Sequence, residues 1–225
     1  MGDSVRFYKV GLSLQAATGV NDLVRRLIDN GKKVFLDYKY YDIAETISKA
    51  VGRVAKLGVS FLTIHGTTSV IKAAVAARGD SELKLFTVTV LTSMDLADVH
   101  EMGIAADSVQ EVVLRRSLIA WRNGSDGVIA SGQEVREIKK LIASNMPDGG
   151  KRGLLVTTPG IRSEGYPAQD QKRVATPRHA VSEGADYLVI GRQVTNPGDI
   201  TPRKAAERVV EEMQSAFNSL SQEPE

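Results

Sequence analysis

The sequence predicts an α/β fold of the (β/α)8 TIM-type barrel class, and three observations support this prediction. Short apolar runs rich in β-branched residues alternate with helical patterns from end to end of the chain. Glycine follows the predicted helices at positions 31, 58, 79, 124 and 184, where a left-handed cap residue belongs. The first strand-to-helix turn lacks a G-x-G-x-x-G fingerprint, which argues against the competing fold, an open doubly wound sheet.

The predicted strands alternate regularly with the predicted helices, as parallel pairing with right-handed crossovers requires. We place the strands at 5–10, 33–37, 59–64, 84–91, 126–130, 153–157 and 186–190. We place the helices at 20–30, 43–57, 68–78, 108–122, 134–144, 177–183 and 203–219. A closed barrel of this class has eight strands. We therefore expect one domain, 1–225, that lacks the usual first β-strand because the chain starts one β/α unit late.

Composition excludes several classes of protein. The 29 basic and 27 acidic residues are nearly balanced, so the chain lacks the dense basic stripe that nucleic acid requires. There are no cysteines, which excludes disulfides, thiolate metal sites and a cysteine nucleophile. No apolar run approaches the ~18 residues of a membrane span, and the first residues do not resemble a signal peptide. We expect a cytoplasmic protein that binds neither nucleic acid nor membrane.

A cluster of charged residues at the end of the second predicted strand is the strongest functional signal. Asp37 and Lys39 are two residues apart and should project from the same side of that strand, with Cα atoms roughly 6.5–7 Å apart. Asp42 follows where the chain turns into a helix. A lysine held between carboxylates stays protonated and can donate a proton at neutral pH. The alternative interpretation is an ordinary surface salt-bridge cluster.

Other polar residues also fall at predicted strand ends, where parallel α/β folds carry their chemistry. They are Lys9, His65, Thr92, Ser93, Ser131, the polar stretch 158–176, Gly191 and Arg192. Barrels frequently bind phosphate with the loops after their last two strands. Gly191 would allow close backbone approach, and Arg192 could grip two phosphate oxygens. Gln171 in the long loop could close over the same group.

These motifs together resemble the orotidine 5'-phosphate decarboxylase family over residues 5 to about 215. The matching segments are Phe7–Leu12, Phe35–Thr46, Val88–Met94, Thr158–Arg162, Gly165, Asp170–Arg173 and Val189–Thr195. The resemblance implies a homodimeric (β/α)8 barrel that converts orotidine 5'-phosphate to UMP and carbon dioxide without cofactor or metal.

The resemblance also implies a role for each matching residue. Lys39 resembles the proton donor to C6 of the pyrimidine, and Asp37 the carboxylate placed against the substrate carboxylate. Asp42 and Thr46 resemble the pair that reaches into the neighbouring subunit's site.

Residues that bind the remainder of the substrate follow from the same resemblance. Lys9 matches a ribose-contacting lysine, and Thr92 and Ser93 lie where the pyrimidine is contacted. Gln171 and Arg192, preceded by Gly191, match the phosphate grip. Arg162 begins the loop that closes over the phosphate.

The chain departs from the family in two places. The family usually opens with a strand ending in an aspartate, which nothing before Met1 supplies, and Ala44, Glu45, Tyr40 and Tyr41 replace commoner residues. Two alternative functions stay open. One is a related enzyme that acts on a keto-sugar phosphate and usually needs magnesium. The other, left open by the missing first strand, is a non-catalytic barrel that binds a phosphorylated ligand.

Overall fold

The structure is a computed structural model that describes residues 1–148, 150, 152–167 and 171–220. By its internal contacts the chain divides into two compact units. The N-terminal unit comprises Arg6–Thr89 and Ser117–Val128, and the C-terminal unit comprises Met1–Val5, Val90–Arg116 and Ile129–Glu225. Each unit carries part of the predicted site.

The described residues contain seven strands, and every predicted strand overlaps one of them. They are β1 (Phe7–Gly11), β2 (Lys33–Tyr40), β3 (Phe61–Ile64), β4 (Lys84–Val88), β5 (Gly127–Ile129), β6 (Leu155–Thr158) and β7 (Tyr187–Leu188). Most are shorter than predicted because the terminal residues of an apolar run leave the hydrogen-bonded ladder first. Only β2 extends well beyond its predicted end, and it does so through the charged cluster.

The seven predicted helices are also present. They are α2 (Val20–Asp29), α3 (Ala44–Ala55), α4 (Thr68–Arg78), α6 (Val109–Arg122), α7 (Val135–Asn145), α8 (Pro177–Ser182) and α10 (Pro202–Leu220). The sequence did not predict the short elements η1 (Gly2–Ser4), α1 (Leu12–Gln15), α5 (Leu96–Glu101) and α9 (Arg192–Thr195). One or two helical turns are too short for a 3.6-residue periodicity to show. No helix in the described ranges has both the length and the apolarity to cross a bilayer.

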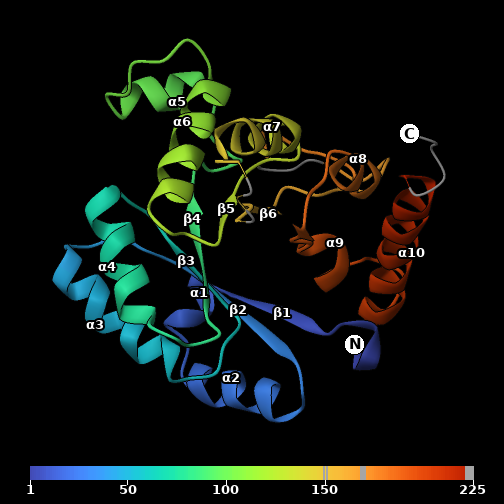
Figure 1. The fold of residues 1–225 in the computed structure, drawn as a ribbon. Coiled ribbons are helices and arrows are strands. Elements are labelled where there is room, and N and C mark those ends of the chain that lie inside the picture. Colours follow the sequence, from blue (N-terminus) through green and yellow to red (C-terminus); the bar gives the residue numbers. More distant parts are fainter. Residues whose placement is uncertain (149, 151, 168–170, 221–225) are drawn as a thin grey trace. The chain divides into compact units, whose positions relative to one another are not determined.

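In the N-terminal unit, strands β1 to β4 pair in parallel and in sequence order (Figure 1). One face of these strands packs on α2, α3 and α4 through a single apolar cluster. Its fully buried members include Val34, Leu62 and Leu85 from the strands and Val51 and Ile71 from the helices. Sequential parallel order is what βαβ units with right-handed crossovers produce, and it agrees with the predicted fold class.

The other face of the same four strands carries an aromatic cluster of four phenylalanines. Phe61 lies edge-on to Phe7, with ring centroids 4.7 Å apart, and its centroid is 4.5 Å from that of Phe86. Phe35 completes the cluster at 5.8 Å from Phe61. Side chains two positions apart share a face of a strand. The residues that follow these phenylalanines by two positions on β1, β2 and β3 are polar, so the aromatic cluster forms the floor beneath them.

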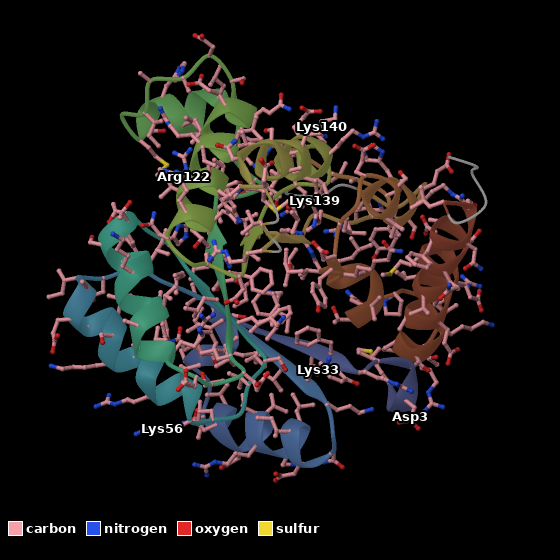
Figure 2. The ribbon with its side chains drawn as sticks, in the orientation of Figure 1. Asp3, Lys33, Lys56, Arg122, Lys139 and Lys140 are labelled. Atoms are coloured by element: carbon pink, nitrogen blue, oxygen red, sulfur yellow. The ribbon has the colours of Figure 1, made fainter. Side chains whose placement is uncertain are left out.

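In the C-terminal unit, β6 and β7 pair in parallel, with Thr157 opposite Tyr187. Lys139 of α7, labelled in Figure 2, donates to Asp186 Oδ2 at 2.6 Å and to the carbonyl oxygen of Leu154 at 3.1 Å. A small apolar cluster formed by Ile161, Ala175 and Ala180 joins the loop after β6 to α8. The base of the long polar loop is thus packed against regular structure.

Candidate active site

The charged cluster in the N-terminal unit consists of one carboxylate between two lysines. The Nζ atom of Lys39 lies 2.9 Å from Oδ1 of Asp37, and the Nζ atom of Lys9 lies 2.9 Å from Oδ2. Lys9 comes from β1, and both other residues come from β2. Asp37 is largely buried, with 14% of its side chain exposed, whereas the two lysine side chains are 33% and 29% exposed. The two lysine side chains are therefore partly accessible to a ligand.

The backbone at Lys39 is strained. Among the described non-glycine residues, only Lys39 has a positive φ, at 50°. The pairing of β2 with β3 shifts its register between Leu36 and Tyr40. A left-handed conformation costs a side-chain-bearing residue on the order of 1–3 kcal/mol. The displaced N–H of Lys39 donates to Oγ1 of Thr63 on β3 at 2.9 Å instead of continuing the ladder.

Electrostatics keeps Asp37 ionised. Its burial alone would raise the pKa of the carboxyl, but the charges of Lys9 and Lys39 and their hydrogen bonds hold that pKa below its ordinary value of 3.8. Thr63 Oγ1 adds a third hydrogen bond, donated to Oδ1 at 3.0 Å. Two cations around one anion leave a net positive charge, which suits a negatively charged ligand.

Asp42 and Thr46 are not part of the cluster formed by Lys9, Asp37 and Lys39. Asp42 is exposed and accepts a hydrogen bond from the backbone N–H of Ile43 at 2.7 Å. Thr46, in the first turn of α3, is also exposed. The sequence suggested a lysine flanked by two acids, whereas within one chain the structure has Asp37 flanked by two lysines.

A second group of predicted residues meets in the C-terminal unit. Thr92 is buried, and its Oγ1 donates to Oε1 of Gln171 at 2.5 Å. Gly160, at the start of the long loop, has a φ of +73°. A Cβ there would lie 3.0 Å from the carbonyl oxygen of Arg173 and 3.3 Å from Gln171 Oε1. Glycine at 160 therefore permits both the left-handed turn and this close approach. Asp170, next to Gln171, lies outside the described residues.

A buried ion pair holds this loop to its neighbours. Nη1 of Arg173 donates to Oε1 of Glu134, and these side chains are only 10% and 5% exposed. Nη2 of Arg173 donates to the carbonyl oxygens of Val90 and Leu91, at 3.2 and 3.0 Å. Burial raises the pKa of Glu134, although Arg173 acts in the opposite direction. Through its bonds to Val90 and Leu91, Arg173 connects the segment that carries Gln171 to the segment that carries Thr92.

An exposed ion pair also attaches the long loop to the residues at the start of α5. Nζ of Lys172 donates to Oδ2 of Asp95 at 2.7 Å and to Oδ2 of Asp98 at 3.0 Å. These two acids form the capping box of α5. The hydrogen bond from Lys172 lowers the pKa of Asp95 to about 2, so the contact remains ionic throughout the physiological range.

The beginning of the loop is held by different partners. Arg162 is buried, and its Nη1 donates to the carbonyl oxygen of Ile161 at 2.7 Å. The next residue, Ser163, exchanges hydrogen bonds of 2.9 and 2.6 Å with Gln193. Gln193 directly follows Arg192 in the sequence, so the loop is joined to the start of α9. In this conformation the guanidinium of Arg162 contributes to the packing of its own loop.

The remaining predicted residues lie on accessible backbone of the C-terminal unit. Arg192 is exposed in the first position of α9, and Gly191 is the residue that precedes this helix. A Cβ at Gly191 would meet no atom within 4 Å, so one side of this backbone is open. Ser93, beside the buried Thr92, is partly exposed.

Sequence patterns missed the supporting residues. Thr63 and Glu134 were not selected, and Arg173 was only noted as part of a motif. For Thr63 a signal existed: it is a polar residue inside a short apolar strand, two positions after Phe61 and on the same face. For Glu134 the spacing Ser131-x-x-Glu134 before a predicted helix was a local signal, and the Ser131 N–H does donate to Glu134 Oε2 at 2.8 Å. No local pattern indicated its ion-pair partner, which lies 39 residues away. The described residues contain no group of three or more His, Asp or Glu side chains placed to hold a metal ion.

Comparison with known proteins agrees with the motifs. Residues 1–209 match the family described as Orotidine 5'-phosphate decarboxylase / HUMPS family. The chain belongs to this family. Among its relatives, the Orotidine 5'-phosphate decarboxylase of Nitrobacter winogradskyi is 49% identical over 217 residues, which cover 96% of this chain and 85% of that relative. The Orotidine 5'-phosphate decarboxylase of Rhodopseudomonas palustris strain HaA2 is 42% identical over 216 residues, covering 96% and 87%.

Solved structures of the decarboxylase family confirm the fold class. The Orotidine 5'-phosphate decarboxylase of Lactobacillus acidophilus superimposes with a TM-score of 0.72 at 35% identity, over 91% of this chain and 85% of that chain. The enzyme from Pyrococcus horikoshii OT3 gives a TM-score of 0.67 at 24% identity, over 94% and 88%, and supports the fold alone. The predicted TIM-barrel class is thus confirmed, and the doubly wound alternative is wrong.

Proposed function

We propose that this protein decarboxylates orotidine 5'-phosphate to UMP, the last step of pyrimidine nucleotide synthesis, as a carbon–carbon lyase. The observation that carries the proposal is the Lys9–Asp37–Lys39 cluster in a member of this family. Relatives between 41% and 49% identical share the decarboxylase name, which favours this reaction over that of a keto-sugar-phosphate enzyme. An ammonium group in a partly buried site also favours catalysis over simple ligand binding.

The chemistry follows from the charges. When the bond between C6 and the carboxylate breaks, its electron pair stays on C6, which the ring delocalises poorly, and carbon dioxide leaves. The Lys39 ammonium beside that carbon stabilises the developing charge and then transfers a proton to it. Lys39 afterwards regains a proton from water. Asp37 orients the ammonium and, placed against the substrate carboxylate, disfavours the ground state. Lys9 contacts the ribose.

The remainder of the nucleotide is assigned to the C-terminal unit. Gln171 and Arg192, with the open backbone at Gly191, bind the phosphate, and Arg162 begins the loop that closes over it. Thr92 and Ser93 contact the pyrimidine. The hydrogen bond between Thr92 and Gln171 supports this assignment because it joins the ring-binding and phosphate-binding segments. Phosphate binding energy can then be used to close the loop and exclude water.

A homodimer is part of the same proposal, with Asp42 and Thr46 reaching the neighbouring subunit's site. Both residues are exposed in the isolated chain. The apolar side chains on either side of Asp42 are exposed as well, at 72% for Tyr41 and 70% for Ile43. Large exposed apolar residues beside a functional acid are typical of a protein–protein interface. A cytoplasmic location is proposed as well.

The function is tested by following the loss of orotidylate absorbance with purified protein. We expect turnover without added metal and equal rates with and without a chelator, because the proposed chemistry uses only protein side chains. Calorimetry with UMP accompanies the assay. Tight UMP binding without turnover would instead support a non-catalytic binding protein, and loss of activity with chelator would support the magnesium-dependent alternative.

The shared site is tested by mixing two inactive variants, Lys39→Ala and Asp42→Ala. If Asp42 acts in the neighbouring site, random exchange of subunits makes half of the dimers mixed, and each mixed dimer has one site with both residues intact. One site in four then has both residues intact, so the mixture should recover about a quarter of the wild-type activity. If Asp42 acts within its own chain, the mixture should be no more active than the mean of the two variants.

A further inference from the structure

The Thr63 side chain lies at the centre of the catalytic cluster of the N-terminal unit. It is fully buried on β3, two residues after Phe61 of the aromatic floor. Its hydroxyl oxygen makes two hydrogen bonds with different purposes: it accepts from the backbone N–H of Lys39 at 2.9 Å and donates to Oδ1 of Asp37 at 3.0 Å. The same Oδ1 accepts from Nζ of Lys39 at 2.9 Å.

We propose that Thr63 is a positioning residue for the reaction: its hydroxyl holds the strained backbone of Lys39 and the carboxylate of Asp37 in the geometry that the proton transfer needs. This inference rests on the proposed function for its catalytic consequence. Thr63 itself touches Lys39 and Asp37, and it acts on the substrate through them.

The first argument is the left-handed backbone at Lys39. A residue with a Cβ adopts a φ of +50° only when its surroundings impose it. At the register shift between Leu36 and Tyr40, the N–H of Lys39 turns out of the ladder and needs another acceptor. Thr63 Oγ1 is that acceptor. Without the Thr63 hydroxyl, the part-buried N–H of Lys39 would find an acceptor more easily in a regular strand conformation. That conformation would move the Lys39 side chain.

The second argument is the orientation of the carboxylate. A carboxylate plane can rotate about its bond to Cβ, and Lys9 and Lys39 pull on its two different oxygens. The Thr63 hydroxyl is a third donor to this carboxylate. Because it belongs to a stiff, β-branched side chain on a strand, it fixes the rotation of the carboxylate plane. The hydroxyl proton is donated to Asp37 because an ionised carboxylate can only accept, while the hydroxyl oxygen accepts from the N–H of Lys39.

The test compares Thr63→Val, which keeps the shape and loses the hydroxyl, with Thr63→Ser, which keeps the hydroxyl. We expect kcat to fall about 10- to 100-fold in Thr63→Val, the cost of misplacing a reacting group by a fraction of an ångström. Thr63→Ser should recover kcat to within about threefold of wild type, as one rotatable hydroxyl can remake both bonds. KM should change less than kcat, since phosphate binding does not involve this residue.

Thr87→Val is the matched control. Thr87 is equally buried on the neighbouring strand β4, but its hydroxyl contacts Ser125 at 3.1 Å. Residue 87 follows Phe86 by one position and so faces away from the aromatic floor, toward the helices. This variant should lose comparable thermal stability without losing kcat. If both variants lose kcat in proportion to their stability, Thr63 has only a structural role and the inference is overturned.

A second readout does not depend on the reaction. Loss of the hydroxyl donor should raise the pKa of Asp37, measured by NMR titration of its carboxyl carbon, and should shift the amide resonance of Lys39. An unchanged titration and amide signal in Thr63→Val would overturn the inference even if turnover falls. Conversely, if wild-type protein shows no orotidylate turnover, the proposed function fails while these two signals still report on the positioning role.

Discussion

Replacement of Lys39 by alanine is expected to lower kcat at least about a thousandfold. Proton transfer from a positioned group contributes roughly 10²- to 10⁴-fold, and stabilisation of developing charge contributes a similar factor. Affinity for UMP should change by less than about fivefold, because the product lacks the charge that Lys39 stabilises in the transition state. Steady-state turnover and calorimetry with UMP measure the two quantities on the same preparation.

Lys49→Ala is a suitable control for this substitution. Lys49 also belongs to the N-terminal unit, and its Nζ lies 3.0 Å from Oε1 of Glu45, but it is exposed on α3. Its removal should leave kcat and UMP affinity unchanged. Alanine and lysine pay the same penalty at a φ of +50°, so the backbone strain does not differ between wild type and Lys39→Ala. More than about a tenth of wild-type activity in Lys39→Ala would contradict the proton-donor role.

Replacement of Arg173 by methionine is expected to lower the free energy of unfolding by about 3–5 kcal/mol, the usual result of leaving one member of a buried ion pair without its partner. Among the described residues, Glu134 would keep the hydrogen bond from the backbone N–H of Ser131, at 2.8 Å, and would lose its cationic partner. The carbonyl groups of Val90 and Leu91 would also lose the hydrogen bonds from Nη2 of Arg173, although Leu91 would still accept from the backbone N–H of Met94 at 2.9 Å. Urea denaturation of the two proteins at neutral pH measures the difference.

The double variant Arg173→Met/Glu134→Gln separates the charge from the packing. It should be less destabilised than Arg173→Met, because the uncompensated buried carboxylate is gone. Arg136→Met is the exposed control: its pair with Glu183 has an arginine side chain that is 57% exposed, so the change should be within about 1 kcal/mol. A double variant as unstable as the single one would show that the buried charge is not the cause.

The lowered free energy of unfolding in Arg173→Met depends on pH, and the sign of this dependence follows from the pKa of Glu134. Burial raises the pKa of Glu134, and the loss of Arg173 would raise it further. The folded state then binds a proton that the unfolded state releases between the ordinary pKa of 4.5 and the raised value. Stability of Arg173→Met should consequently increase, relative to wild type, as the pH falls through that interval toward 4.5.

The loop that carries Gln171 shows how the site depends on supporting contacts. Three successive residues attach the same segment to the region after β4: Gln171 to Thr92, Lys172 to the capping box of α5, and Arg173 to two carbonyl groups. A side chain proposed to bind phosphate is thus followed directly by two residues that are themselves attached to this region. Preorganisation of this kind lowers the entropy cost of ligand binding.

Much of the fold could be read from the order of residues because it is governed by local periodicity. Every predicted strand and helix overlaps an observed one, because buried apolar runs such as 34–36 alternate with helical patterns, as they do in parallel α/β folds. The family could also be read directly, since its motifs are contiguous. Asp37 and Lys39 were expected on one side of a strand, and their side chains do meet, 2.9 Å apart.

What only the tertiary structure decided depends on contacts between residues far apart in sequence. The sequence placed Lys39 at the end of a strand, but the register shift that forces its φ to +50° arises from pairing with β3, 24 residues away. The partner of Arg173 is likewise 39 residues distant and is selected by burial of both charges. Strand and helix periodicity is set by each residue's nearest neighbours along the chain. Hydrogen bonds that orient a catalytic group are set by which strands lie side by side, and that information exists only once the chain has folded.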